Sequence, residues 1–253
     1  MTLSRGMAAK LLDGSLKVFG DTPVLCGHRG SGRGHEENTL PSFRAAVAAG
    51  LRWVEVDARA TADGVLVARH DPELEDGRAV AQLRAAETGL MRVADLFEEL
   101  PHEVSIDVEV KSALEAALRP RERTTAALVA ELVAAHDRNV LVTSFDPAAL
   151  LIVRERLPEV PLGLLTWTRF PLRKAIPAAR HLGLEVVVAN VESFPPDAAP
   201  PVRVAHEAGL EVAAWCPAPA EREALLAAGV DCLVIDDVTA ISAGAAPVPP
   251  RSA

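Results

Sequence analysis

Residues 23–30 read PVLCGHRG, a short apolar run that ends in a glycine-rich loop carrying a histidine and an arginine. The run is predicted to be a buried strand, and the glycines mark the turn where the chain leaves it. Histidine can move a proton near neutral pH, so His28 is a candidate for acid/base chemistry. The Arg29 guanidinium can bind the oxygens of an anion such as phosphate. The stretch therefore predicts a strand that delivers polar side chains into a loop, and this order recurs down the chain.

Strand-like and helix-like segments alternate through almost the whole sequence. The predicted strands cover residues 24–27, 53–59, 65–69, 104–110, 140–145, 162–167, 185–189, 211–215 and 232–235. The predicted helices cover residues 40–49, 93–100, 124–135, 147–157, 172–181, 201–207 and 219–227. The strand at 65–69 follows a turn and is expected to form a hairpin with the strand before it. About eight βα units remain, and their alternation implies a parallel sheet.

This pattern in 253 residues predicts an α/β protein with a (β/α)8 TIM barrel. A doubly wound open sheet is the alternative, but the glycines between residues 27 and 34 lack the spacing of a dinucleotide-binding loop. We expect one barrel domain at residues 23–240. An N-terminal extension at residues 1–22 and a flexible C-terminal tail at residues 241–253 complete the expected organisation.

Composition narrows the class of protein. Hydrophobic residues make up 49% of the chain, enough for a sizeable core, and the formal net charge is −9. That charge argues against nucleic-acid binding, which needs a basic patch, but not against an anionic substrate, because a bound divalent cation reverses the local field. Cys26, Cys216 and Cys232 are expected to be buried free thiols rather than a disulfide framework. No apolar segment is long enough to span a bilayer, so we expect a cytoplasmic protein without membrane insertion.

Two pairs of charged residues lie near the predicted ends of strands. Glu55 and Asp57 share one face, because side chains alternate along a strand, and Glu109 and Lys111 do the same on a later strand. Carboxylate oxygens suit Mg²⁺ or Ca²⁺, and barrel enzymes keep their active sites at the C-terminal ends of strands. The alternative for Glu55 and Asp57 is a pair of solvated acids at a strand end, and the alternative for Glu109 and Lys111 is a modest surface ion pair.

A second histidine, His70, follows the predicted strand at 65–69. Two histidines permit acid/base chemistry in which one accepts a proton and the other donates one. An ordinary turn histidine is the alternative for His70 taken alone. The polar residues at or just past the ends of the early strands are expected to form one site: His28, Arg29, Glu55, Asp57, His70, Glu109 and Lys111.

In these motifs the sequence resembles the glycerophosphodiester phosphodiesterase family. The resemblance runs in order from about residue 23 to residue 239, and as a set its motifs are highly specific. They are HRG at 28–30, ENT at 37–39, Phe43, Gly50, EVD at 55–57, TADG at 61–64, HD at 70–71, EVK at 109–111, SF at 144–145, Trp215, GVD at 229–231 and Asp236.

The resemblance implies a barrel of the phosphatidylinositol-phosphodiesterase type and one divalent metal ion, Mg²⁺ or Ca²⁺. The residues that match the family's metal ligands are Glu55, Asp57 and Glu109, and Glu37 matches a glutamate of the first loop near that site. The implied reaction is hydrolysis of a small-molecule glycerophosphodiester to sn-glycerol 3-phosphate and an alcohol.

The resemblance also implies roles for the remaining site residues. His28 and His70 match the general acid/base pair, and Arg29 and Lys111 match the phosphate-binding cations. Trp215 would line the pocket for the glycerol or alcohol portion. A metal and cations that neutralise the phosphoryl oxygens, with a histidine that protonates the departing alkoxide, suit the chemistry of a phosphodiester.

The chain departs from the family pattern on the side that recognises the alcohol. The segment between His70 and Glu109 is short, so the family's insertion subdomain is expected to be small or missing. CP at 216–217 follows Trp215 where many members have Thr-Val-Asn, and IDDV at 235–238 replaces the frequent Thr-Asp-x-Pro. With no tyrosine and 4% aromatic residues, an aromatic cage for a choline group is not obvious. A lysophospholipase D-like hydrolase of acylated glycerophosphodiesters and a non-catalytic phosphodiester-binding barrel remain the alternatives.

Overall fold

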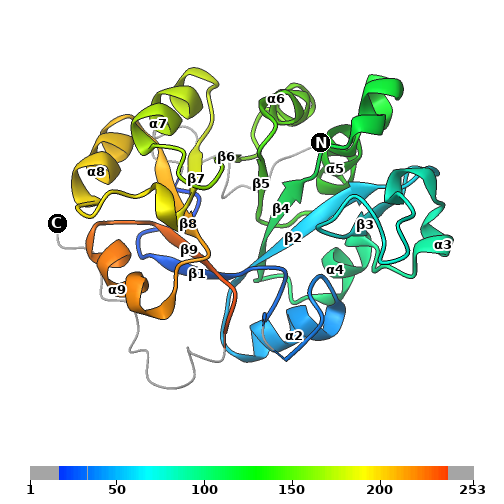
Figure 1. The fold of residues 1–253 in the computed structure, drawn as a ribbon, viewed down its shortest axis with the longest axis horizontal. Coiled ribbons are helices and arrows are strands. Elements are labelled where there is room, and N and C mark those ends of the chain that lie inside the picture. The colour runs from blue at the N-terminus through cyan, green and yellow to red at the C-terminus, as the bar shows by residue number, and fades with distance from the viewer. Residues whose placement is uncertain (1–16, 33, 239–253) are drawn as a thin grey trace.

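The chain closes into a barrel of eight parallel strands with helices on the outside, in a computed structural model that describes residues 17–32 and 34–238 (Figure 1). Each of the eight barrel strands pairs with the next barrel strand along the chain, and the last, β9, pairs with β1 to close the ring. The predicted TIM barrel is therefore confirmed. The barrel strands are β1 (Val24–Gly27), β2 (Trp53–Ala60), β4 (Ser105–Val110), β5 (Val140–Ser144), β6 (Leu162–Leu165), β7 (Val186–Asn190), β8 (Glu211–Trp215) and β9 (Cys232–Ile235).

The extra strand β3 (Leu66–Ala68) pairs antiparallel with the end of β2, as the hairpin prediction requires. Between β3 and β4 the chain forms only a 3₁₀ turn (Val80–Gln82), the single-turn helix α3 (Ala85–Thr88) and α4 (Val93–Glu99). This segment contains no separate subdomain, so the short insertion expected from the sequence is confirmed.

The longer helices lie over the outward faces of the strands (Figure 1). Side chains such as Val56, Val108 and Val142 point outward and are fully buried beneath them. The remaining helices are α2 (Leu40–Ala48), α5 (Thr125–Ala134), α6 (Pro147–Arg156), α7 (Leu172–His181), α8 (Ala199–Glu207) and α9 (Pro219–Ala227). Among the described residues, no helix has both the length and the apolar character needed to cross a bilayer.

Helix starts follow local chemistry. The Thr39 side chain accepts a hydrogen bond from the backbone amide of Ser42 at the start of α2, as expected for an N-cap. Helix α8 begins two residues earlier than predicted. Its prolines occupy the first turn, where their missing amide protons are not needed for helical hydrogen bonds.

The residues just before β1 cover the N-terminal end of the barrel. Val18 and Phe19 are buried there, and the Phe19 ring packs edge-on against Trp53 at 5.2 Å. The backbone amides of Val18 and Phe19 both donate to the Glu211 carboxylate at the start of β8. Part of the expected N-terminal extension is thus integral to the barrel. Residues 1–16 of that extension and the expected tail at 241–253 lie outside the described residues.

Candidate active site

Three buried carboxylates converge at the C-terminal end of the barrel. Glu55 and Asp57 of β2 and Glu109 of β4 each offer an oxygen atom within 4.8 Å of the other two. Asp57 lies opposite Glu109 in the parallel β2–β4 ladder, and strand alternation turns all three side chains inward. The fold therefore brings together the three acids that the sequence analysis singled out.

Lys111 lies among these carboxylates, with its Nζ 2.9 Å from Asp57 Oδ1 and 2.5 Å from Glu109 Oε1. Asn38 Nδ2 donates to Asp57 Oδ2 at 2.8 Å. Burial alone would raise the pKa of Asp57, but Lys111 and Arg29 outweigh burial and hold this pKa below its ordinary value. Asp57 is therefore ionised at neutral pH.

Glu55 and Glu109 are less well compensated. Burial raises the pKa of Glu55 well above its ordinary value, and the nearby carboxylates of Asp57 and Glu109 raise it further. Burial also raises the pKa of Glu109, although Lys111 opposes the shift. Glu55 Oε1 is buried with no hydrogen-bond partner among the described residues. Carboxylate oxygens are the hard donors that Mg²⁺ and Ca²⁺ prefer, and the positive charge around these carboxylates does not fully compensate them. This donor set is therefore suited to a divalent cation.

A fourth buried acid, Asp107, lines the same cavity and was missed by the sequence analysis. It precedes Glu109 by two residues on β4, so the alternation that linked Glu109 with Lys111 could have found it. Thr143 Oγ1 donates to Asp107 Oδ1 at 2.8 Å. Burial raises the pKa of Asp107 to about 8, even though this hydrogen bond lowers it. Asp107 therefore holds a proton at neutral pH.

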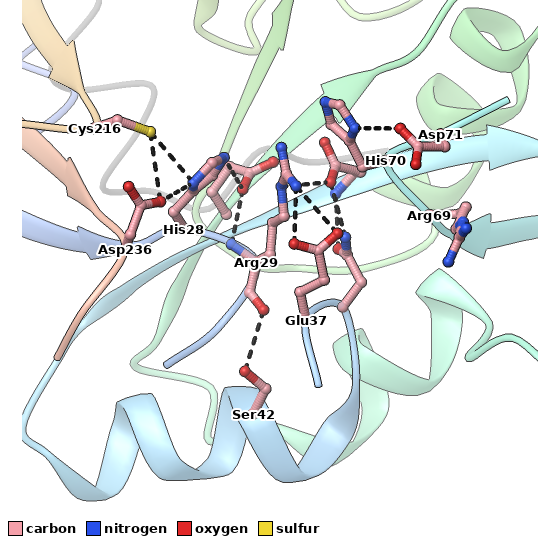
Figure 2. A network of polar contacts seen from close by, with 12 residues as sticks. His28, Arg29, Glu37, Ser42, Arg69, His70, Asp71, Cys216 and Asp236 are labelled. Atoms are coloured by element: carbon pink, nitrogen blue, oxygen red, sulfur yellow. Dashed lines mark hydrogen bonds and ion pairs between the residues drawn. The ribbon is translucent and has the colours of Figure 1, made fainter. Parts of the chain in front are cut away.

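Arg29 links the first loop to the carboxylates. Its backbone has a left-handed φ of 52°, and its amide donates to Glu55 Oε2 at 2.9 Å. The guanidinium Nη1 donates to both carboxylate oxygens of Glu37 at 2.9 and 3.1 Å (Figure 2). Its Nε lies 3.1 Å from Asp57 Oδ2. Arg29 borders the cavity, whereas Glu37 reaches the carboxylates through Arg29.

His28 follows β1 and is held by a residue to which the sequence analysis gave no role. His28 Nδ1 lies 2.5 Å from Asp236 Oδ1 (Figure 2). Its Nε2 lies 3.8 Å from Glu55 Oε2. The hydrogen bond from His28 lowers the pKa of Asp236, so this carboxylate is ionised and can only accept. Nδ1 therefore carries the proton, and Nε2 is directed toward the carboxylates. Asp236 immediately follows β9, as His28 immediately follows β1, so its place at a strand end is the signal that could have identified it.

Cys216 follows β8 and contacts both members of this pair, with its Sγ 3.6 Å from His28 Nδ1 and 3.4 Å from Asp236 Oδ1. Burial raises the pKa of the Cys216 thiol well above its ordinary value, and Asp236 raises it further. The thiol is protonated at neutral pH and is not a nucleophile. All three cysteines are free: Cys26 and Cys232 are buried as expected, but Cys216 is only partly so.

His70 follows β3 and borders the same cavity as His28. Its Nδ1 lies 2.8 Å from Asp71 Oδ1, and its carbonyl oxygen accepts from Arg59 Nε at 3.0 Å. Burial lowers the pKa of His70, although Asp71 opposes the shift. The second predicted histidine is thus brought to the site and kept neutral at physiological pH.

Aromatic side chains form the opposite wall of the cavity. Phe145 stacks on Trp167 with ring centroids 4.4 Å apart and meets Trp215 edge-on at 6.2 Å. Trp215, to which the resemblance gives a pocket role, borders the cavity, and Trp167 is 68% exposed at the cavity mouth. The low aromatic content of the chain gave no sign that these three rings would gather at one place.

Comparison with known proteins gives consistent matches. A sequence model described as the glycerophosphoryl diester phosphodiesterase family matches residues 28–240. The probable glycerophosphodiester phosphodiesterase 2 of Mycobacterium tuberculosis is 30% identical over 224 residues, which cover 79% of this chain and 81% of the relative. A glycerophosphodiester phosphodiesterase of Caldanaerobacter subterraneus is 22% identical over 237 residues, with coverages of 85% and 94%.

Solved structures share the fold. An Oleispira antarctica phosphodiesterase in complex with the product sn-glycerol-3-phosphate superposes with a TM-score of 0.77 at 23% identity, covering 89% of this chain and 97% of that chain. A putative glycerophosphoryl diester phosphodiesterase from Silicibacter pomeroyi gives a TM-score of 0.76 at 24% identity, with coverages of 90% and 96%. The fold and the family match define a TIM-barrel enzyme that cleaves phosphoric diesters. The chain belongs to the glycerophosphoryl diester phosphodiesterase family.

Proposed function

We propose that the protein hydrolyses glycerophosphodiesters to sn-glycerol 3-phosphate and an alcohol, using one divalent metal ion, Mg²⁺ or Ca²⁺. The observation that carries this proposal is the convergence of Glu55, Asp57 and Glu109 within 4.8 Å, in a cavity that His28 and His70 also border. The Oleispira antarctica relative, bound to the product sn-glycerol-3-phosphate, supports the choice of substrate class.

The three carboxylates would hold the metal ion, which when bound supplies positive charge to the phosphoryl oxygens. Lys111 shares two of these carboxylates, Asp57 and Glu109, and its ammonium group would bind a phosphate oxygen. Arg29 would bind a second phosphate oxygen from the first loop, with Glu37 holding its guanidinium in place. Trp215 would contact the alcohol portion from the opposite wall.

The two histidines would share the proton transfers. His70 is neutral, because burial lowers its pKa, and is therefore suited to remove the proton from the attacking oxygen of water or of the neighbouring glycerol hydroxyl. His28 keeps one proton on Nδ1, held by Asp236, and presents Nε2 toward the carboxylates; in its doubly protonated form, with a second proton on Nε2, it would protonate the departing alkoxide. Each transfer is expected to contribute about 10²–10⁴ to the rate.

A substrate panel tests this proposal on the purified full chain, with Mg²⁺ or Ca²⁺ and with excess chelator. Turnover of glycerophosphoethanolamine should require metal, and His28→Ala and Glu55→Gln should each lower kcat by about 10²-fold or more. His206→Gln is the matched control, because His206 pairs with Asp231 at the opposite end of the barrel. Wild-type turnover in chelator would remove the metal from the proposal. Substrate binding without turnover in the metal-loaded protein would indicate a non-catalytic phosphodiester-binding barrel instead.

The aromatic wall favours a second candidate substrate, a glycerophosphodiester that carries an acyl chain. Leu165 and Val234 also line the cavity, so this side of it is apolar, and Trp167 continues that surface to the exterior. Turnover of a lysophospholipid, compared with glycerophosphoethanolamine, would reveal a lysophospholipase D-like activity. Trp167→Ala should then raise KM for the lysophospholipid selectively. Leu151→Ala, an exposed apolar residue on α6, is the control.

A further inference from the structure

A second group of potential metal ligands lies beside the carboxylates and contains a thiol. Cys216 follows β8, Asp236 follows β9 and His28 follows β1, and these three strands are neighbours in the barrel (Figure 2). Each side chain offers one ligand atom, and the three atoms lie within 4.8 Å of one another. Imidazole, thiolate and carboxylate together are a typical donor set for Zn²⁺, whereas Mg²⁺ and Ca²⁺ prefer oxygen alone.

The distances within this group fit tetrahedral coordination. Bond lengths of about 2.3 Å to sulfur and about 2.0 Å to nitrogen or oxygen require separations of about 3.5 Å from sulfur to either neighbour. Cys216 Sγ lies 3.6 Å from His28 Nδ1 and 3.4 Å from Asp236 Oδ1, so two of the three ligand-to-ligand separations already match a tetrahedral site. The third, 2.5 Å from Nδ1 to Oδ1, must widen by about 0.8 Å. The Asp236 side chain is 58% exposed and has room to make that adjustment.

The backbone conformation places Cys216 beside the other two residues. Cys216 has a left-handed φ of 56°, which non-glycine residues seldom adopt. Its amide donates to the Val234 carbonyl oxygen at 2.9 Å, so the residue is anchored to β9 directly beside Asp236. The backbone of Cys216 is therefore fixed close to both neighbours, so that closing a metal site requires only side-chain movement, which reduces its conformational cost.

We propose that His28, Cys216 and Asp236 form an inhibitory site for a thiophilic divalent cation such as Zn²⁺ or Cd²⁺, with water as the fourth ligand. On binding, the thiol releases its proton to solvent, and the His28 proton moves from Nδ1 to Nε2 as Nδ1 becomes a ligand. With Nδ1 bound to the cation, His28 can hold only the one proton on Nε2, and giving it up would leave an imidazolate, so the ring can no longer form the imidazolium that donates to the alkoxide. This inhibition rests on the proposed function of His28, whereas the binding itself does not.

Cadmium binding tests the site without turnover. The full chain, with saturating Mg²⁺ to occupy the carboxylates, is titrated with Cd²⁺ while the ultraviolet thiolate-to-cadmium absorption is followed. One Cd²⁺ per chain should bind with this absorption in the wild type, and Cys216→Ser and Cys216→Ala should both lose it. His206→Gln, which alters a histidine–aspartate pair that lacks a cysteine ligand, should retain it. Absorption that persists in both Cys216 variants would assign the signal to Cys26 or Cys232 and overturn the proposal.

Inhibition gives the second readout. Each variant's phosphodiesterase rate with Zn²⁺ is compared with its own rate without Zn²⁺, at saturating Mg²⁺. The zinc concentration for half-inhibition should rise about 10-fold or more in Cys216→Ser. An unchanged value would overturn the inhibitory role. A protein that binds Cd²⁺ through Cys216 but hydrolyses no glycerophosphodiester would contradict the proposed function and leave the binding site supported.

Discussion

At the scale of single residues, Asp236 determines how His28 can act. The ionised carboxylate accepts the proton on Nδ1, so Nε2 is the nitrogen directed toward Glu55. Without this partner the ring is free to adopt the other tautomer and to rotate. Asp236 is thus a positioning residue that acts on the reaction through His28.

Replacing Asp236 with Asn should therefore lower kcat while leaving KM nearly unchanged. The amide can present either its oxygen or its NH₂ group to Nδ1, so it no longer selects one tautomer, and we expect a loss of about 10²-fold or more. Steady-state kinetics with saturating Mg²⁺ measure the effect. Asp21→Asn, at the opposite end of the barrel, is the control, and equal kcat values for the two variants would contradict the positioning role.

Asp107 predicts a pH dependence of stability. Its pKa is about 8 in the folded chain against an ordinary value of 3.8, so the folded state holds a proton that the unfolded state releases between these pH values. Stability from this group is therefore lost as pH rises from about 4 to about 8, by at most about 1.4 kcal/mol per pH unit. Asp107→Asn stays neutral and can still accept from Thr143.

Denaturant unfolding in excess chelator, at several pH values between about 5 and about 8, checks this expectation. The free energy of unfolding of Asp107→Asn should exceed that of the wild type by a margin that grows with pH. Asp197→Asn, which alters an exposed acid, should follow the wild type. A margin that is constant across the range would show that Asp107 is ionised in the folded chain.

At the scale of elements, the site depends on the contact between the loops that follow β1 and β9. Gly32 has a φ of +68° and forms an antiparallel bridge with Asp237. A Cβ atom on Gly32 would lie 1.4 Å from the carbonyl oxygen of Asp236. No side chain fits at this position unless the two loops separate.

Gly32→Ala should accordingly move Asp236 away from His28 and reduce kcat by about 10-fold or more, with a lower melting temperature. Gly34→Ala is a matched control, because Gly34 also has a positive φ, +94°, but a Cβ there meets nothing within 4 Å. The control carries the backbone strain without the clash. Similar kcat losses in both variants would locate the effect in backbone strain.

The segment before β1 covers the end of the barrel away from the site, so changes there should affect stability rather than activity. Phe19→Ala removes a buried ring that packs on Trp53, and we expect the free energy of unfolding to fall by about 3 kcal/mol. The folded variant should keep the wild-type kcat. Thermal unfolding and kinetics on the same sample measure both, and a large loss of kcat in the folded variant would show that the two ends are coupled.

At the scale of the whole molecule, the chain has a net charge of −9, and the buried acids Glu55, Asp57 and Glu109 lie close together at one end of the barrel. Burial raises the pKa of Glu55 and of Glu109, so folding of the metal-free chain works against their ionisation. A divalent cation would relieve this cost for the folded state alone, which couples metal binding to stability.

Adding Mg²⁺ or Ca²⁺ to the chelated protein should therefore raise its melting temperature. When the free metal concentration is 100 times its dissociation constant, the free energy of unfolding should increase by about 2.7 kcal/mol. Below the raised pKa values of Glu55 and Glu109, protons compete with the metal for these carboxylates. The increase in stability on adding metal should therefore be larger at higher pH. Differential scanning fluorimetry of the wild type and Glu55→Gln checks this, and an equal gain in the variant would place the cation elsewhere.

Local patterns in the sequence are enough to predict the strands, which residues share a strand face and the order of eight βα units, because side-chain alternation and helix capping act over a few residues. They also identified Glu55 with Asp57 and Glu109 with Lys111, which are two residues apart. Only the tertiary structure decided that Asp236 and Cys216 meet His28, 208 and 188 residues away along the chain. The count of βα units predicts a closed ring, but which side chains meet where β9 closes onto β1 depends on strand register and loop conformation, which no local pattern encodes.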